Sequence, residues 1–197
     1  MRHKLQTCIV ILSGCLLLAG CAPEFGLDMK VPSLPDPSGI SDGGAEAASL
    51  RVRIGAFSDA RPSSTIAVID GREIPAQGSL SLVVQEAFQR YFHDAGMKVV
   101  MLDAPIVSGE ILEWKARISP GFPVSEATAS AKIRVELKDS QRHMLFRGVF
   151  TGEATGSHPL LDEEKVQQLL GLAMAGAIER AVREGGIQSR LSQGRIE

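Results

Sequence analysis

The longest strictly alternating stretch in this chain runs from Ala127 to Leu137. Apolar side chains occupy every second position, and polar side chains such as Thr128, Lys132 and Glu136 stand between them. A period of two places the two sets on opposite faces of a β-strand, so the stretch predicts a strand with one buried and one wet face. Neighbouring strands must share that asymmetry, which is typical of an antiparallel sheet covered on one side.

Other apolar patterns predict five further strands and two helices. A period of 3.6 predicts a helix over residues 80–95, with Ser79 as its N-cap and Gly96 as its stop, and a second helix over about 162–184. The further strands cover residues 50–56, 66–69, 97–101, 112–118 and 145–154. Together they predict an α+β fold: a two-layer sandwich of a mostly antiparallel sheet of about six strands with two helices on one face.

The first twenty residues have the features of an export signal. Arg2 and Lys4 precede an apolar stretch, residues 8–18, that is too short to span a bilayer. Leu18-Ala19-Gly20-Cys21 then resembles the lipobox of bacterial lipoproteins. That resemblance implies cleavage before Cys21, a thioether-linked diacylglycerol on its sulfur and acylation of the new N-terminus, and several acyl chains give durable anchoring. The alternative is a plain secretory signal cleaved near Ala22.

The cysteine count adds to this expectation. Cys8 and Cys15 leave with the signal and Cys21 carries lipid, so we expect no disulfide, thiolate nucleophile or cysteine-based metal site in the mature chain. Ala22 stands where a sorting-avoidance aspartate would stand, which by resemblance to enterobacterial sorting favours the outer membrane, facing the periplasm. A net charge of −2 argues against nucleic acid as a partner, because such binders are basic.

The chain divides into four parts. A signal peptide covers residues 1–20, a lipidated cysteine with a Pro/Gly/Ser-rich tether 21–49, a single domain 50–186, and a polar, loose tail 187–197. The tether would span roughly 30 Å as a coil and on the order of 90 Å when stretched, which would let the domain stand off the membrane. An irregular arm packed on the domain is the alternative for residues 26–31 only.

The stretch FSDARPSS, residues 57–64, contains the strongest candidate site. Asp59 and Arg61 follow the first predicted strand and could form an interaction loop for an anion or a partner. The alternative is structural: Asp59 closes an Asx turn and pairs with Arg61 before Pro62. We favour the second interpretation, because no base, nucleophile or second carboxylate lies nearby in the sequence.

No other pattern predicts catalysis. His93, His143 and His158 lack the spacing of a metal motif, and the chain has neither a phosphate-binding glycine loop nor a nucleophile elbow. Trp114 alternates with core residues, which favours packing over a ligand platform. We therefore expect no catalytic residue, no cofactor, no metal and no enzymatic activity.

The order of these features resembles the YajG-like family of bacterial lipoproteins over about residues 50–186. Asp59 and Arg61 match its D-x-R after the first strand, and Gly96 matches its helix-ending glycine. The helices "LVVQEAFQRYFHDAG" and "VQQLLGLAMAGAIERAV" flank three strands, whereas "STIAVIDGREIP" departs from the simpler loop of the family. The resemblance implies an outer-membrane lipoprotein without an established enzymatic activity.

The expected function is therefore a non-enzymatic binding or adaptor lipoprotein of the cell envelope. Acyl chains on Cys21 would hold it to the membrane, and its partner would be a periplasmic protein or envelope assembly. The alternative is a lipid- or glycan-handling accessory lipoprotein of a transporter, which predicts an apolar groove between helix and sheet. An envelope hydrolase would need Asp59, Arg61 and a histidine within hydrogen-bond reach. The oligomeric state stays open.

Overall fold

The computed structural model describes residues 26–33, 50–69, 71–159 and 162–193. The signal region, Cys21 and residues 34–49 therefore lie outside the described residues. The elements, in chain order, are β1 (Leu27–Asp28), β2 (Arg51–Asp59), β3 (Thr65–Ile69), β4 (Arg72–Gln77), α2 (Leu80–Asp94), β5 (Lys98–Val99), β6 (Ile106–Ser119), β7 (Ser125–Lys138), β8 (Met144–His158), α3 (Glu163–Arg183) and α4 (Ile187–Gln193).

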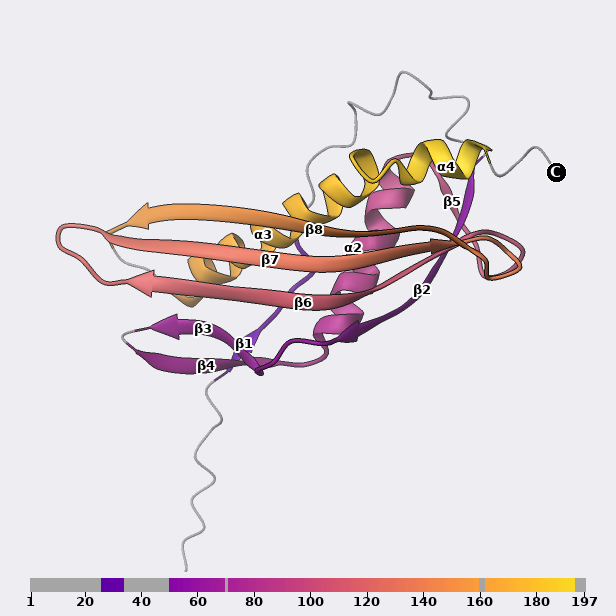
Figure 1. Ribbon diagram of the computed structural model, residues 1–197. Helices are drawn as coiled ribbons and strands as arrows, with labels where there is room; N and C mark the ends of the chain where they lie inside the picture. Colours follow the sequence, from indigo (N-terminus) through magenta and orange to yellow (C-terminus); the bar gives the residue numbers. More distant parts are fainter. Residues whose placement is uncertain (1–25, 34–49, 70, 160–161, 194–197) are drawn as a thin grey trace, which may run out of the picture.

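The eight described strands form one mixed sheet around β6 (Figure 1). On one side of β6, β7 pairs antiparallel along its length, and β8 pairs antiparallel with β7. On the other side β2 and β3 follow one another, and both run parallel to β6. β4 pairs antiparallel with β3, β1 parallel with β4, and β5 parallel with β2.

The α+β class and the two main helices on one face of the sheet are confirmed (Figure 1). The expectation of about six, mostly antiparallel strands is wrong, because the sheet has eight described strands and four of its seven described pairings are parallel. β4 and then α2 bring the chain back before β5 and β6 begin, so β5 and β6 both run parallel to β2. β4 lacked a clear signal because Pro75 interrupts its apolar pattern at a register shift.

Both helices begin and bury their apolar stripes as the sequence predicts. The Ser79 side chain accepts a hydrogen bond from the Leu82 backbone N–H, and Gly96 has the positive φ of 79° expected after the helix. The Phe88 ring of α2 stacks on Phe57 of β2, with 4.9 Å between centroids. Helix α3 covers β6, β7 and β8 from the same side, so one apolar core lies between the sheet and both helices.

Gly152 of β8 and Gly176 of α3 bring the backbones of helix and sheet into contact. A Cβ atom added to Gly152 would overlap the carbonyl oxygen of Ala173 and lie 2.5 Å from the backbone nitrogen of Ala177. A Cβ atom on Gly176 would instead meet the Cα of Gly152 at an ordinary 3.7 Å. The space between α3 and β8 is therefore closed at this point.

Residues 26–33 form an arm that packs on the domain. Leu27 and Met29 are buried in the core, whereas Asp28 and Lys30, which alternate with them, are exposed. β1 within this arm pairs with β4, Leu27 opposite Ala76. The interpretation of residues 26–31 as a packed arm therefore describes the structure, and the free tether does not extend over them.

The expectation of a loose tail from residue 187 is wrong over residues 187–193. α4 forms there, with Ile187 and Leu191 buried and Arg190 lying over the Phe146 ring at 5.2 Å from its centroid. Ile187 and Leu191 stand four positions apart, about one turn of a helix. A single pair of apolar residues among polar neighbours is too little to predict a helix from the sequence.

Candidate functional site

Asp59 and Arg61 lie where β6 changes its partner strand. β2 pairs with the first half of β6 up to Asp59, which stands opposite Ile111. β3 resumes the pairing with Ala67 opposite Ala116. The chain leaves the sheet between these two registers, so no strand of the described residues lies beside the middle of β6, around Trp114, on this side.

Arg61 fills that gap. Its Nη1 donates to the carbonyl oxygens of Thr65 at 3.1 Å and Trp114 at 3.3 Å, while Nε and Nη2 donate to the two carboxylate oxygens of Asp59 at 2.9 and 3.0 Å. Asp59 Oδ1 also accepts from the Arg61 backbone N–H at 3.2 Å, which closes an Asx turn. Because the Arg61 side chain is only 5% exposed, the motif is a clamp that carries the sheet across its gap.

The electrostatics of the pair agree with this role. Partial burial acts to raise the pKa of Asp59, but the hydrogen bonds and charge of Arg61 outweigh it and hold that pKa below its ordinary value. His93 and His143 bond to Asp94 and Asp139 instead. The structure therefore matches the structural interpretation of the motif, and an interaction role for the loop stays a prediction.

Trp114 connects the clamp to α3. Its side chain is fully buried and its Nε1 donates to the Leu170 carbonyl oxygen at 3.0 Å, while its own carbonyl oxygen accepts from Arg61. The prediction that Trp114 is packed rather than a ligand platform is confirmed. One residue thus links the position of the helix to the gap in the sheet.

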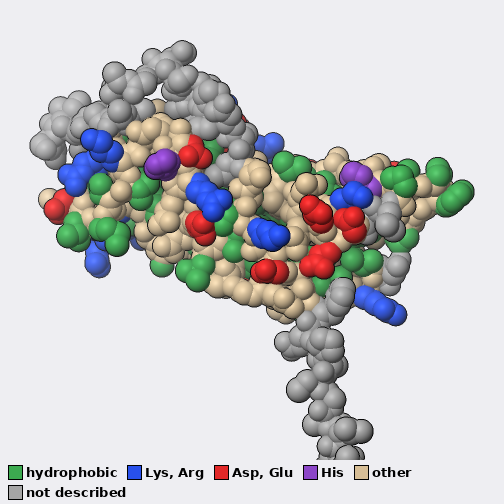
Figure 2. All heavy atoms as spheres, turned by 180° about the vertical axis from the view of Figure 1, so that it is seen from behind, with side chains coloured by type: hydrophobic (Ala, Val, Ile, Leu, Met, Phe, Trp, Pro, Cys, Tyr) green, Lys and Arg blue, Asp and Glu red, His purple; other side chains and the backbone are tan. Residues whose placement is uncertain are grey.

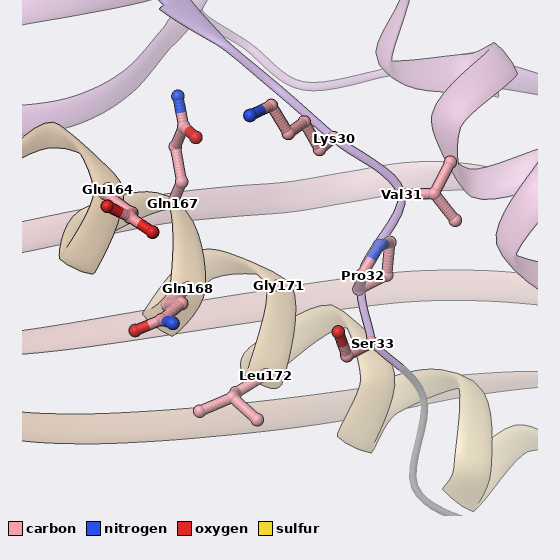
Figure 3. A pocket seen from close by; sticks show the side chains of 9 residues that line it. All are labelled: Lys30, Val31, Pro32, Ser33, Glu164, Gln167, Gln168, Gly171 and Leu172. Carbon is pink, nitrogen blue, oxygen red and sulfur yellow. The ribbon is translucent and has the colours of Figure 1, made fainter.

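A groove of about 500 Å³ lies between the arm and α3 (Figure 3). Lys30, Ser33 and the α3 side chains Glu164, Gln167 and Gln168 contribute its polar groups, whereas the greater part of the lining surface is apolar and includes the exposed Leu172. This groove is not the predicted apolar groove between helix and sheet. Its amide, hydroxyl and charged groups can form hydrogen bonds with a ligand that also covers the apolar part of the lining.

The face of the sheet opposite the helices carries paired charges. Arg134 of β7 bonds to Glu110 of β6, and Glu136 contacts Lys138 at 2.8 Å and Arg147 of β8 at 2.7 Å. Hydrogen bonds from Lys138, opposed by partial burial and assisted by Arg147, lower the pKa of Glu136. The predicted wet face is thus a cross-strand ladder of opposite charges. The helix side also mixes both signs of charge (Figure 2).

Exposed apolar side chains gather at one end of the sheet, which we call the apolar end. In the loop between β5 and β6, Met101 is 88% and Leu102 68% exposed. Met144 and Leu145 at the start of β8 are 43% and 37% exposed, and they lie at the same end because Ile106 and Met144 both pair with Lys138. Exposed apolar side chains that share one end of a domain mark a candidate interaction surface.

A metal site and a membrane-spanning helix each have requirements with which the described residues can be compared. No group of three or more His, Cys, Asp or Glu side chains in the described residues could hold a metal ion. Within the same residues, no helix is long and apolar enough to cross a membrane. Cys21, the predicted lipidation site, lies outside them.

Sequence reasoning missed the groove and the apolar end. In the groove, Pro32 of the arm lies against Gly171, whose added Cβ would be 3.4 Å from the proline Cβ, and no local pattern in the sequence predicts this contact. The strand predicted at 97–101 includes Met101 and ends directly before Leu102, whereas β5 has only two residues, Lys98 and Val99. A shorter strand would have left Met101 and Leu102 in a loop.

No protein-family model matches the chain, and no curated protein matches its sequence. Protein XCC0632 from Xanthomonas campestris, of family model DUF330, has a similar structure, with a TM-score of 0.53 and 15% identity over 86% of this chain and 94% of that chain. A minor lipoprotein from Acinetobacter baumannii matches with a TM-score of 0.42 and 10% identity over 71% and 92%. A putative lipoprotein from Caulobacter crescentus CB15 matches with 0.38 and 14% over 80% and 96%. The likeness to XCC0632 shows a shared fold.

Proposed function

We propose that this chain is a lipid-anchored lipoprotein of the outer membrane that faces the periplasm. The observation that carries the proposal is Leu18-Ala19-Gly20-Cys21, placed directly after a basic start and a short apolar stretch. Membership of the YajG-like family is part of the proposal and is supported by the D-x-R clamp and the Gly96 helix end.

The domain acts in this proposal as a non-enzymatic binding or adaptor module. Arg61, the most promising side chain in the sequence, is occupied within the fold. The apolar end instead offers Met101 and Leu102 on a loop, where exposed apolar groups are available to a partner. We propose that a periplasmic protein or envelope assembly docks there.

The anchoring step is tested by Cys21→Ser in cells fed radiolabelled palmitate. We expect the variant to lose all label and to leave the envelope fraction, because the sulfur that forms the thioether is gone. Cys15→Ser is the matched control, since that cysteine lies in the cleaved signal, and it should keep both. Label retained in Cys21→Ser would disprove the lipidation site.

Docking at the apolar end is tested with a photo-crosslinking residue at position 101 in intact cells. We expect a discrete protein adduct that is lost when Leu102→Ser and Met144→Ser are combined with it, because a partner that buries these side chains loses most of its apolar contact. The same residue at the exposed, polar position 155 of β8 serves as control. Equal adducts at both positions would contradict a specific surface.

The second candidate function is a glycan-handling accessory lipoprotein of a transporter, and the groove between the arm and α3 favours it. Gln167 and Gln168 line this groove with amide groups that can both donate to and accept from sugar hydroxyls. The crosslinking residue at position 167 distinguishes the candidates. Polysaccharide adducts there, without protein adducts at position 101, would replace the adaptor proposal by this one.

A further inference from the structure

The arm changes how far the domain can stand from its anchor. Leu27 and Met29 are 3% and 5% exposed, and Pro32 is buried against α3. Val31 points toward α2 while Pro32 lies beside Gly171, so the arm runs between the two helices (Figure 3). Pairing of Leu27 with Ala76 and of Asp28 with Gln77 fixes its first residues to the sheet. Because these contacts hold the arm to the sheet and to α3, the domain effectively begins at Gly26.

The distance from the anchor follows from covalent geometry. Cys21 and Gly26 are five residues apart, so their Cα atoms cannot be separated by more than about 18 Å. A free segment over residues 22–49 could have spanned on the order of 90 Å. Residues 34–49 then connect two points that are both on the domain and add nothing to its reach.

We propose that the arm holds the domain against the bilayer, with the edge formed by β1 and β4 nearest the lipid. In this subsection the clamp means this arm, not the Arg61 motif. The proposal rests on the proposed lipidation of Cys21. A Cβ added to Gly26 would touch Gln77 and lie 3.1 Å from the Pro75 carbonyl oxygen, so the chain enters the domain at β4. The surface that meets the membrane is thus defined by β4, and its partner is the lipid headgroup layer.

The opposite edge of the sheet faces away from the membrane in this arrangement. One row of paired residues crosses the sheet from Glu73 of β4, through Val68, Arg117 and Thr128, to Thr155 of β8. Four strand spacings separate the ends of that row by about 19 Å. β8 is therefore the edge that a partner in the compartment would reach first.

Two matched insertions test the clamp on the lipidated, full mature chain in phosphatidylethanolamine–phosphatidylglycerol vesicles that contain an acceptor dye on the lipid headgroups. A donor dye is attached at Glu73→Cys, an exposed position. A Gly/Ser segment of about 30 residues, which spans roughly 30 Å as a coil, is inserted either between Glu24 and Phe25 or between Ser41 and Asp42. The first site precedes the arm and the second follows it.

We expect the upstream insertion to lower energy transfer at least about twofold and the downstream insertion to leave it unchanged, because only the upstream one lengthens the connection to the lipid. The unmodified chain with its dye at Thr155→Cys should show weaker transfer than with its dye at Glu73→Cys. Equal loss from both insertions, or no loss from either, would overturn the clamp, and a reversed order of the two dyes would overturn the orientation.

Palmitate labelling of each variant separates the two proposals. Unlabelled protein overturns the anchoring itself, whereas labelled protein with equal responses to the two insertions overturns the clamp alone.

Discussion

Gly152→Ala is expected to lower the free energy of unfolding by at least about 3 kcal/mol. For a chain of this size, that loss corresponds to a fall in Tm of about 10 °C. The added Cβ would overlap the Ala173 carbonyl oxygen, and a backbone atom inside a helix cannot move away as a side chain can. Relief would require α3 to shift off β8, which would also strain the hydrogen bond from Trp114 to Leu170. Thermal unfolding followed by circular dichroism measures the effect.

Gly176→Ala is the matched control on the other side of the same contact. Its Cβ would sit at an ordinary 3.7 Å from the Gly152 Cα, and alanine in a helix interior gains about 0.5–1 kcal/mol over glycine. We expect this variant to be neutral or slightly more stable. If both variants lost the same stability, the close approach of α3 to β8 would not be the reason for Gly152.

The two long periodic elements were predictable because each buries one face in the usual way. β7 alternates buried and wet side chains over residues 125–138, and α3 buries one broad stripe between its Asp162 N-cap and Arg183. Such regular patterns follow from the period of a strand or helix alone. The strand predicted at 145–154 is likewise present, as part of β8, which pairs with β7.

The pairing of the strands could not be predicted from local patterns. β2 and β3 share one side of β6 in succession, and this arrangement depends on where α2 returns the chain. The arm illustrates the same limit. Leu27 and Met29 alternate with charged residues over too few positions to outweigh a composition rich in proline and glycine, and β4 supplies the partner that gives the pattern meaning.

The candidate site was predictable in its local half only. An aspartate two residues before an arginine and a proline indicates an Asx turn with an ion pair, and both are present. The Trp114 carbonyl, 53 residues away, is the acceptor that makes Arg61 a clamp, and it is exposed for bonding only because β2 and β3 leave a gap beside β6.

Arg61→Ala is therefore expected to destabilise the domain by about 3 kcal/mol, because it leaves the partly buried carbonyl oxygens of Thr65 and Trp114 and the partly buried Asp59 carboxylate without their side-chain donor. Arg90→Ala is the control: it removes an exposed pair with Glu86 one helical turn away, and should change stability by no more than about 0.5 kcal/mol. Urea unfolding gives both values. Equal small losses would show that Arg61 is an accessory rather than a clamp.

The pH dependence separates the ion pair from the carbonyl bonds. The folded pKa of Asp59 lies below its unfolded value, so the stability it contributes is present above the unfolded pKa and is lost as the pH falls through the folded one. Asp59→Asn should therefore be less stable than the unmodified chain at neutral pH, and the difference should shrink below about pH 4. Arg61→Ala should keep part of its deficit there, because the Trp114 and Thr65 carbonyls do not titrate. A deficit that vanished with acid in both variants would assign the whole effect of Arg61 to its charge and remove the carbonyl bonds from the explanation.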